Sequence, residues 1–232
     1  MLFREDPQRY LRGLREGLPI VLNVLAITVV EHVLDTALSF GLTPIGFVLQ
    51  SPDAEPIWFW LIWLMFGGTL LLYLLDLQTW EVPYGVLILV MSTAGLLVNV
   101  GELVRSLAAR AGSEGMLLLV DGCLIWASNI LIFTVWYWLI DGGGYLRRTE
   151  RNTDPPDFLF PLRATPQPTY PKWRPHYFDY LFLALTTSTA FGPTDTPPLS
   201  GWAKLLQAMQ ALISLAVAAL IVARAVNILP IQ

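Results

Sequence analysis

Charge is scarce in this sequence: Asp, Glu, Lys and Arg together make up 14% of its 232 residues, whereas 55% are hydrophobic. A soluble globular domain carries about a quarter charged residues. This shortage excludes an ordinary soluble domain and predicts a protein embedded in a lipid bilayer. The formal net charge of −4 also excludes a basic nucleic-acid-binding surface, so no nucleic-acid partner is expected.

Cysteine and histidine are almost absent. Cys123 is the single cysteine, and His32 and His176 are the two histidines. A lone cysteine excludes an intrachain disulfide and a thiolate metal site, and two distant histidines do not complete a nucleophile–base arrangement. We therefore expect no enzyme activity, no cofactor and no resident metal.

Long apolar runs are what the sequence has instead. A membrane-spanning helix needs about 20 mostly apolar residues, and four runs meet this requirement: residues 57–75, 82–101, 115–140 and 205–223. Residues 1–56 read as an N-terminal amphipathic and membrane-associated helical region, because their apolar stretch at 18–50 is interrupted by charge. The expected fold is all-α, a polytopic membrane protein with four transmembrane helices.

The charges inside that N-terminal stretch offer one hypothesis of function. Glu31 and Asp35 are four residues apart on one helix face, and His32 lies next to Glu31. Ionisable side chains within a membrane segment are candidates for proton relays or metal binding. The alternative is a solvated cluster at the membrane interface, since no second cluster completes a site.

The loops predict the orientation. The 76–83 connection is acidic, and the 105–114 connection contains Arg105 and Arg110. Because basic residues accumulate in cytoplasmic loops, we expect the 105–114 connection and the C-terminus on the cytoplasmic side of a cell membrane, namely a bacterial inner membrane. Residues 142–177 then form an extracellular, proline-rich collar, although their six basic residues oppose this orientation.

The segment between the collar and the last helix is too short to cross a bilayer. About ten apolar residues from Phe178 are followed by threonines, a serine, Gly192 and three prolines. Backbone at membrane depth that is not helical is tolerated only where it lines a cavity or is buried in protein. A short helix that enters the membrane and a loop that returns from it are therefore expected at 178–200.

An outer helix, a collar, a short helix, a hydroxyl-rich loop and an inner helix together resemble the pore of the potassium-channel superfamily. Residues 123–229 are also similar to an uncharacterised bacterial membrane-protein family with an ion-channel-like pore. The resemblance implies a homotetramer, a monovalent cation (K⁺ or Na⁺) as permeant ion, and a filter-like loop. That loop comprises Thr187, Ser188, Thr189, Ala190, Phe191 and Gly192, with Pro193 and Asp195 at its outer mouth.

The filter-like loop departs from the potassium-channel pattern in ways that bear on selectivity. Ala190 stands where the family has its first filter glycine, Phe191 replaces tyrosine, and Pro193 replaces the following aspartate. A Cβ atom in the left-handed conformation costs about 1–2 kcal/mol. The pattern thus predicts a wider loop and weak discrimination of potassium from sodium.

Three regions follow from these observations: 1–56, a two-helix hairpin at 57–114, and a channel-like pore domain at 115–232. The pore domain divides into an outer helix (115–141), a collar (142–177), a pore helix with its filter-like loop (178–200) and an inner helix (201–229). A homotetrameric cation channel of relaxed selectivity is the predicted function. The alternatives are a small transporter or proton or metal carrier that uses Glu31, His32 and Asp35, and a non-conducting scaffold.

Overall fold

The computed structural model of the protein describes residues 21–30, 64, 67, 68, 71, 78–109, 115–141, 156–165, 173–192 and 195–228. In these residues all regular structure is helical, apart from one isolated bridge between Phe158 and Pro198. The predicted all-α class is therefore confirmed for this part of the chain.

Three helices are long and apolar enough to cross a membrane: α4 (Gln78–Ala109), α5 (Gly115–Ile140) and α9 (Gly201–Ile228). Their apolar portions are Tyr84–Arg105, Leu119–Ile140 and Gly201–Ala223, of 22, 22 and 23 residues. At a rise of about 1.5 Å per residue each is about 33 Å long, which matches the hydrocarbon thickness of a bilayer. These helices correspond to three of the four predicted spans, and the fourth, at 57–75, lies mostly outside the described residues.

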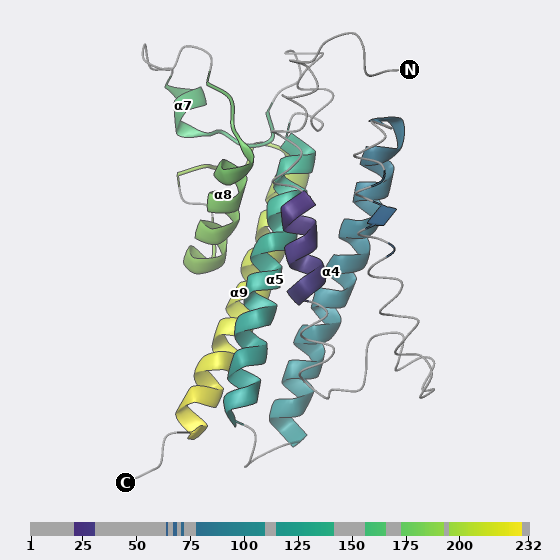
Figure 1. Ribbon diagram of the computed structural model, residues 1–232. Helices are drawn as coiled ribbons and strands as arrows, with labels where there is room; N and C mark the ends of the chain where they lie inside the picture. Colours follow the sequence, from purple (N-terminus) through teal and green to yellow (C-terminus); the bar gives the residue numbers. More distant parts are fainter. Residues whose placement is uncertain are drawn as a thin grey trace.

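Helix α5 occupies the centre of the bundle, and α4, α8 and α9 all pack against it. Its sequence is apolar around the whole circumference, a pattern that indicates a helix covered on all sides. Ile132, Phe133 and Tyr137 are fully buried accordingly. Figure 1 shows that α4 and α9 run in one direction and α5 in the other. The end of the bundle where α5 ends and α8 and α9 begin is called the collar end below.

Residues Val21–Val30 form a short apolar helix that lies beside α4 and α5 (Figure 1). Ile27 joins the hydrophobic core, and the amide of Asn23 donates a hydrogen bond of 3.4 Å to the backbone oxygen of Leu131. Part of the predicted N-terminal helical region is therefore packed on the bundle. Glu31, His32 and Asp35 follow it immediately and lie outside the described residues.

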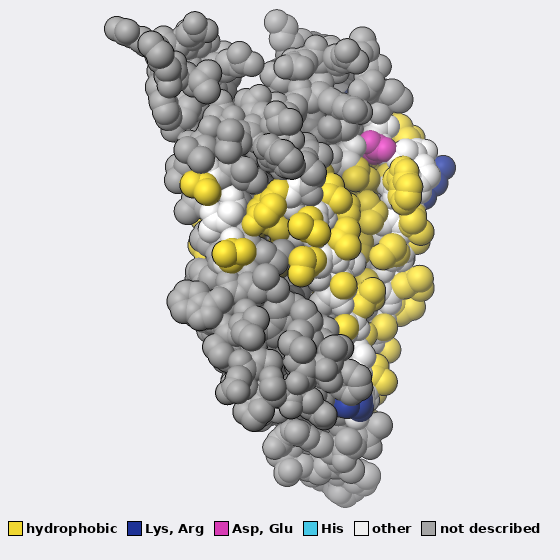
Figure 2. All heavy atoms as spheres, turned by 90° about the vertical axis from the view of Figure 1, so that its right-hand side faces the viewer, with side chains coloured by type: hydrophobic (Ala, Val, Ile, Leu, Met, Phe, Trp, Pro, Cys, Tyr) yellow, Lys and Arg dark blue, Asp and Glu magenta, His cyan; other side chains and the backbone are white. Residues whose placement is uncertain are grey.

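The surface of the described bundle is what a lipid environment requires. On the face drawn in Figure 2, hydrophobic side chains cover the middle of the described surface, and charged ones appear only towards its two ends. Exposed apolar side chains on α4 include Leu87, Val90 and Leu97, which are 50–54% accessible. This distribution is typical of a membrane protein, in which lipid covers the apolar belt.

Candidate functional site at the end of helix α8

Helix α8 (Tyr177–Ala190) is 14 residues long, which gives a length of about 21 Å, too short to cross a bilayer. It begins at the collar end because the carboxylate of Asp179 accepts a hydrogen bond of 2.6 Å from the backbone N–H of His176, half of a capping box. Figure 1 shows α8 ending part of the way along α5 and α9, which continue well beyond it.

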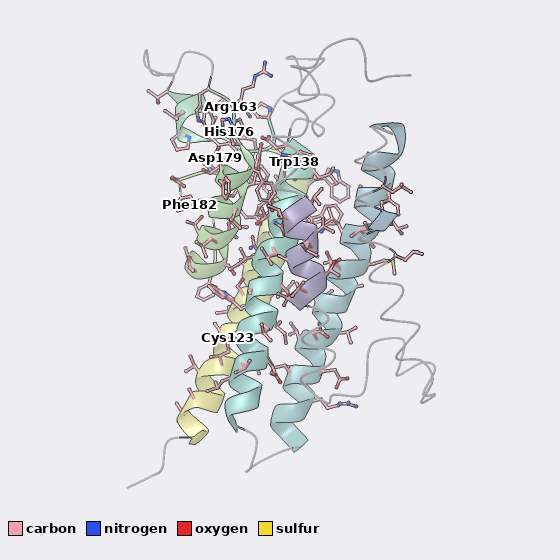
Figure 3. The ribbon with its side chains drawn as sticks, viewed as in Figure 1. Cys123, Trp138, Arg163, His176, Asp179 and Phe182 are labelled. Atoms are coloured by element: carbon pink, nitrogen blue, oxygen red, sulfur yellow. The ribbon has the colours of Figure 1, made fainter. Side chains whose placement is uncertain are left out.

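One face of α8 packs on the bundle, and the opposite face is uncovered in a single chain. The buried face includes Tyr180, Ala184 and Ser188. Phe178 and Phe182 are 69% and 56% exposed, and Figure 3 shows Phe182 on the side of α8 that points away from α5 and α9.

The helix extends four residues into the predicted filter-like loop. Residues 187–190 were expected in that loop, but they form the last turn of α8. Threonine hydroxyls explain this: Thr186 Oγ1 donates to the carbonyl oxygen of Phe182 at 2.9 Å, and Thr189 Oγ1 to that of Leu185 at 3.0 Å. Hydroxyls that bond to the preceding turn are compatible with a continuing helix.

The left-handed residue is Phe191 and not Ala190. Phe191 caps the C-terminus of α8 with a φ of 55°, whereas Ala190 is helical. The expectation of backbone strain at Ala190 was therefore wrong in position. The strain lies one residue later, where glycine is the common residue at helix ends.

The end of α8 lies deep in the bundle. The hydroxyl oxygens of Ser188 and Ser214 are 2.6 Å apart, and Ser214 is about 20 Å along α9 from Gly201, at about 1.5 Å per residue. Asn129, which bonds to Ser214, is about 17 Å along α5 from Ile140 by the same measure. If α5 and α9 cross a bilayer of about 30 Å, α8 ends beyond its middle.

Three polar side chains of α9 contact α8 near this end. Gln207 Nε2 donates to Thr187 Oγ1 at 3.1 Å, and Gln210 Nε2 donates to the backbone oxygen of Ala184 at 2.9 Å. The third contact is the Ser214–Ser188 hydroxyl pair. All of these side chains are at most 3% exposed, so α8 and α9 meet here through hydrogen bonds shielded from solvent.

Helix α5 holds the same α9 residues from the other side. The Tyr137 hydroxyl donates to Gln210 Oε1 at 2.5 Å, and Asn129 Nδ2 donates to Ser214 Oγ at 2.7 Å. We call the residues of these contacts the polar core: Asn129, Tyr137, Thr187, Ser188, Gln207, Gln210 and Ser214. Polar side chains in the middle of a membrane bundle cost free energy unless they form hydrogen bonds, and functional sites commonly contain them.

The predicted filter residues separate into two groups. Thr187 and Ser188 belong to the buried polar core, whereas Thr189, Ala190 and Phe191 are exposed and Gly192 is half-buried. Pro193 lies outside the described residues. Asp195 is exposed, and its Oδ1 accepts a hydrogen bond of 3.4 Å from Thr196.

A buried carboxylate fixes the collar end of the site. Asp141, 1% exposed, accepts hydrogen bonds from the Tyr180 hydroxyl at 2.5 Å and from the backbone N–H of Asp157 at 2.8 Å. Arg163, in the short helix α7 (Pro161–Ala164), lies 3.7 Å from the same carboxylate. Asp141 therefore joins α5, the collar segment and α8. Figure 3 labels Arg163 at this end, together with His176, which immediately precedes α8, and Asp179 in the first turn of α8.

The collar segment in turn holds the chain that returns from α8 to α9. Leu159 N–H donates to the Pro197 oxygen at 3.1 Å, and Leu199 N–H donates to the Asp157 oxygen at 2.7 Å. Aromatic rings pack beneath these bonds, with Phe158 5.1 Å from Tyr137 and Phe160 5.3 Å from Tyr180 between ring centroids. The end of the returning segment that leads into α9 is thus attached to the collar segment.

Sequence reasoning missed the glutamines of α9 and the role of Asp141. Two glutamines inside an otherwise apolar span were a usable signal, because amides in lipid require partners. Asp141 gave a weaker signal, since its partners are separated from it by 16 to 39 residues. In the residues that the structure describes, no group of three His, Cys, Asp or Glu side chains that could hold a metal is found.

The described fold is that of a helical protein with three potential membrane spans and a half-length helix that ends inside the bundle. No family model, curated protein or solved structure matches the chain.

Proposed function

We propose that the protein is a homo-oligomeric cation channel, in which the end of α8 and the turn after it form the narrow part of the ion path. The proposal rests on the depth at which α8 ends. The last four carbonyl groups of a helix have no partner within the helix, and at membrane depth such groups require protein, water or an ion.

The charge at this position favours a cation. The C-terminus of a helix carries a partial negative charge of about half an electron. Residues 177–200 contain Asp179 and Asp195 but no Lys or Arg. An anion at the end of α8 would meet like charge, whereas a cation would be stabilised there.

An ion path of this kind needs several copies of the chain, because a single α8 cannot surround an axis. Helix α9 has an uncovered apolar stripe with alternating spacings of three and four residues, the pattern of helices that pack side by side. The exposed residues of this stripe are Leu205, Ala208, Leu212, Leu215, Ala219, Val222 and Val226. Four copies, as the resemblance to the potassium-channel pore implies, would form a closed ring through heterologous contacts.

Weak ion discrimination is part of the proposal. A row of extended carbonyl groups replaces the hydration shell of potassium in a selective filter. Here the helical conformation extends to Ala190, which leaves few extended residues before the chain turns back. We therefore propose passage of both potassium and sodium.

Planar-bilayer recording of the purified protein tests this function. Discrete current steps that reverse between the potassium and sodium equilibrium potentials, with no chloride current, are expected. A carrier would transport ions without discrete steps, and a scaffold would give no flux. Either of these results from correctly assembled protein would contradict the proposed function.

A further inference from the structure

The hydroxyls of Ser188 and Ser214 behave differently from five threonine hydroxyls of the described helices. Each of those threonines donates to the carbonyl oxygen four residues earlier in its own helix, at 2.6–3.0 Å; they are Thr28, Thr93, Thr134, Thr186 and Thr189. Ser188 and Ser214 instead bond to each other across the α8–α9 contact. Their hydroxyls therefore connect two different helices, α8 and α9.

Asn129 extends this connection to α5. Its Nδ2 donates to Ser214 Oγ at 2.7 Å and lies 3.4 Å from the backbone oxygen of Gln210. Asn129, Ser188 and Ser214 are each at most 1% exposed. Ser214 Oγ accepts from Asn129 and still has one hydrogen and one lone pair for Ser188, so either hydroxyl of the Ser188–Ser214 pair can be the donor.

We infer that Ser214 and Asn129 are positioning residues that set the depth and rotation of the last turn of α8, and through it the orientation of Thr189–Gly192 in the ion path. The effect on ion selection rests on the proposed function. The positioning itself does not, since it follows from the contacts of a single chain.

Hydrogen bonds are needed for this task because apolar packing alone would allow α8 to slide. Phe182 and Leu185 lie on its exposed face, and Leu183 and Ala184 on its packed face. Most of its contacts are therefore apolar and impose no particular distance or angle. A hydrogen bond weakens steeply with distance and angle. The Ser188–Ser214–Asn129 chain therefore helps to select one register of α8 on α9, together with the bonds from Gln207 to Thr187 and from Gln210 to the backbone oxygen of Ala184.

The test compares Ser188→Ala, Ser214→Ala and the double variant with the wild type, each in a Cys123→Ser background that also carries Thr189→Cys. The rate at which a water-soluble methanethiosulfonate reagent modifies Cys at 189 reports the position of the last turn. Each single variant should change this rate by about threefold to tenfold, as expected for the loss of one interhelical hydrogen bond in a membrane bundle. The double variant should change it no further than Ser214→Ala alone, because Ser214→Ala already removes the only bond that Ser188→Ala removes.

Ser128→Ala is the matched control. Ser128 is also fully buried on α5, but its hydroxyl has no hydrogen-bond partner in the described part of the chain, so the labelling rate should not change. In the same proteins without the Thr189→Cys change, the reversal potential between potassium and sodium solutions should shift for Ser188→Ala and Ser214→Ala only.

The outcomes separate the inference from the proposed function. Unchanged labelling in Ser214→Ala, or effects that add in the double variant, would overturn the positioning role. Absence of current in the wild type would overturn the channel proposal, and the labelling rates would then decide the positioning role alone. Native mass spectrometry of each variant shows whether it assembles; if Ser214→Ala does not, the labelling rate of Ser188→Ala against the Ser128→Ala control decides the positioning role.

Discussion

Among the residues that the structure describes, Phe191 is the only one other than glycine with a left-handed backbone conformation. Such a conformation costs a residue with a Cβ atom about 1–2 kcal/mol, and it ends α8 immediately before the chain turns back. Ala190, one position earlier, is helical and has no such cost. Substitution by glycine should therefore affect the stability of the protein differently at these two adjacent residues of the proposed ion path.

Phe191→Gly and Ala190→Gly should change the stability of the protein in opposite directions. Glycine at 191 removes the left-handed strain, partly offset by lost packing, so we expect a change between zero and a gain of about 1 kcal/mol. Glycine at 190 should destabilise the helix end by up to about 1 kcal/mol. Thermal unfolding in detergent measures both, and a lower melting temperature for Phe191→Gly than for Ala190→Gly would contradict the assigned conformation.

Asp141 is the residue on which the collar end depends. Its carboxylate receives bonds from α8 and from the collar segment, and hydrogen bonds to charged groups are worth about 1.5–3 kcal/mol. Tyr180 supplies one of these bonds. Tyr177, also buried on α8, has a hydroxyl without a partner in the described part of the chain.

Tyr180→Phe and Tyr177→Phe therefore form a matched pair. The first should destabilise the protein by about 1.5–3 kcal/mol, because Asp141 loses a donor while buried. The second should be neutral or slightly stabilising, since it removes an unsatisfied polar group. Equal losses of melting temperature in the two variants would argue against the Asp141 anchor.

At the scale of elements, the contact between α5 and α9 determines where α8 can lie. The two helices approach closely at Gly122, where an added Cβ atom would be 2.6 Å from Ile221 Cγ1 and 3.1 Å from its Cδ1. Small residues allow such approaches between membrane helices. The polar core lies further along the same contact, so its hydrogen bonds depend on this spacing.

Gly122→Leu should push α9 away from α5 and cost about 1–3 kcal/mol, as overpacked substitutions do. Gly95→Leu on α4 is the control, because nothing lies within 4 Å of a Cβ atom at that position. Melting temperatures in detergent compare the two. A loss no greater for Gly122→Leu than for Gly95→Leu would show that the close approach is not required.

At the scale of the whole molecule, the question is whether the uncovered side of α9 contacts another copy of the chain or lipid. Leu212 is 67% exposed in the middle of α9, and Leu97 is 50% exposed on α4. In the proposed assembly the first side chain meets another copy and the second meets lipid. The same substitution at the two positions therefore distinguishes an interface from a lipid-facing surface.

Native mass spectrometry in detergent should show a fourfold assembly of the wild type. Leu212→Asn should shift the population towards smaller species, because an amide replaces an apolar contact between copies, whereas Leu97→Asn should leave it unchanged. A wild type that is only monomeric, or equal effects of the two substitutions, would contradict an assembly through α9.

Much of the fold could be predicted because its causes are local in sequence. Residues 82–101, 115–140 and 205–223 were recognised as spans from composition alone, since lipid requires about 20 consecutive apolar residues with their backbone paired internally. The short length of the segment after the collar was evident for the same reason. The C-terminal boundary of α8 was predicted wrongly, because serine and threonine residues are compatible with a loop and also with a helix. In a helix their hydroxyls donate to the backbone carbonyls of the preceding turn.

The sequence by itself determined a helical membrane protein with a segment between the collar and α9 that is too short to span. Only the tertiary structure decided that Thr187 and Ser188 face α9 while Thr189 is exposed, and that Asp141 receives Tyr180. The reason is physical: Thr187, Ser188 and Asp141 meet partners 20 to 39 residues away. Apolar length is a property of one segment, whereas a hydrogen bond between helices depends on how two segments are placed in space.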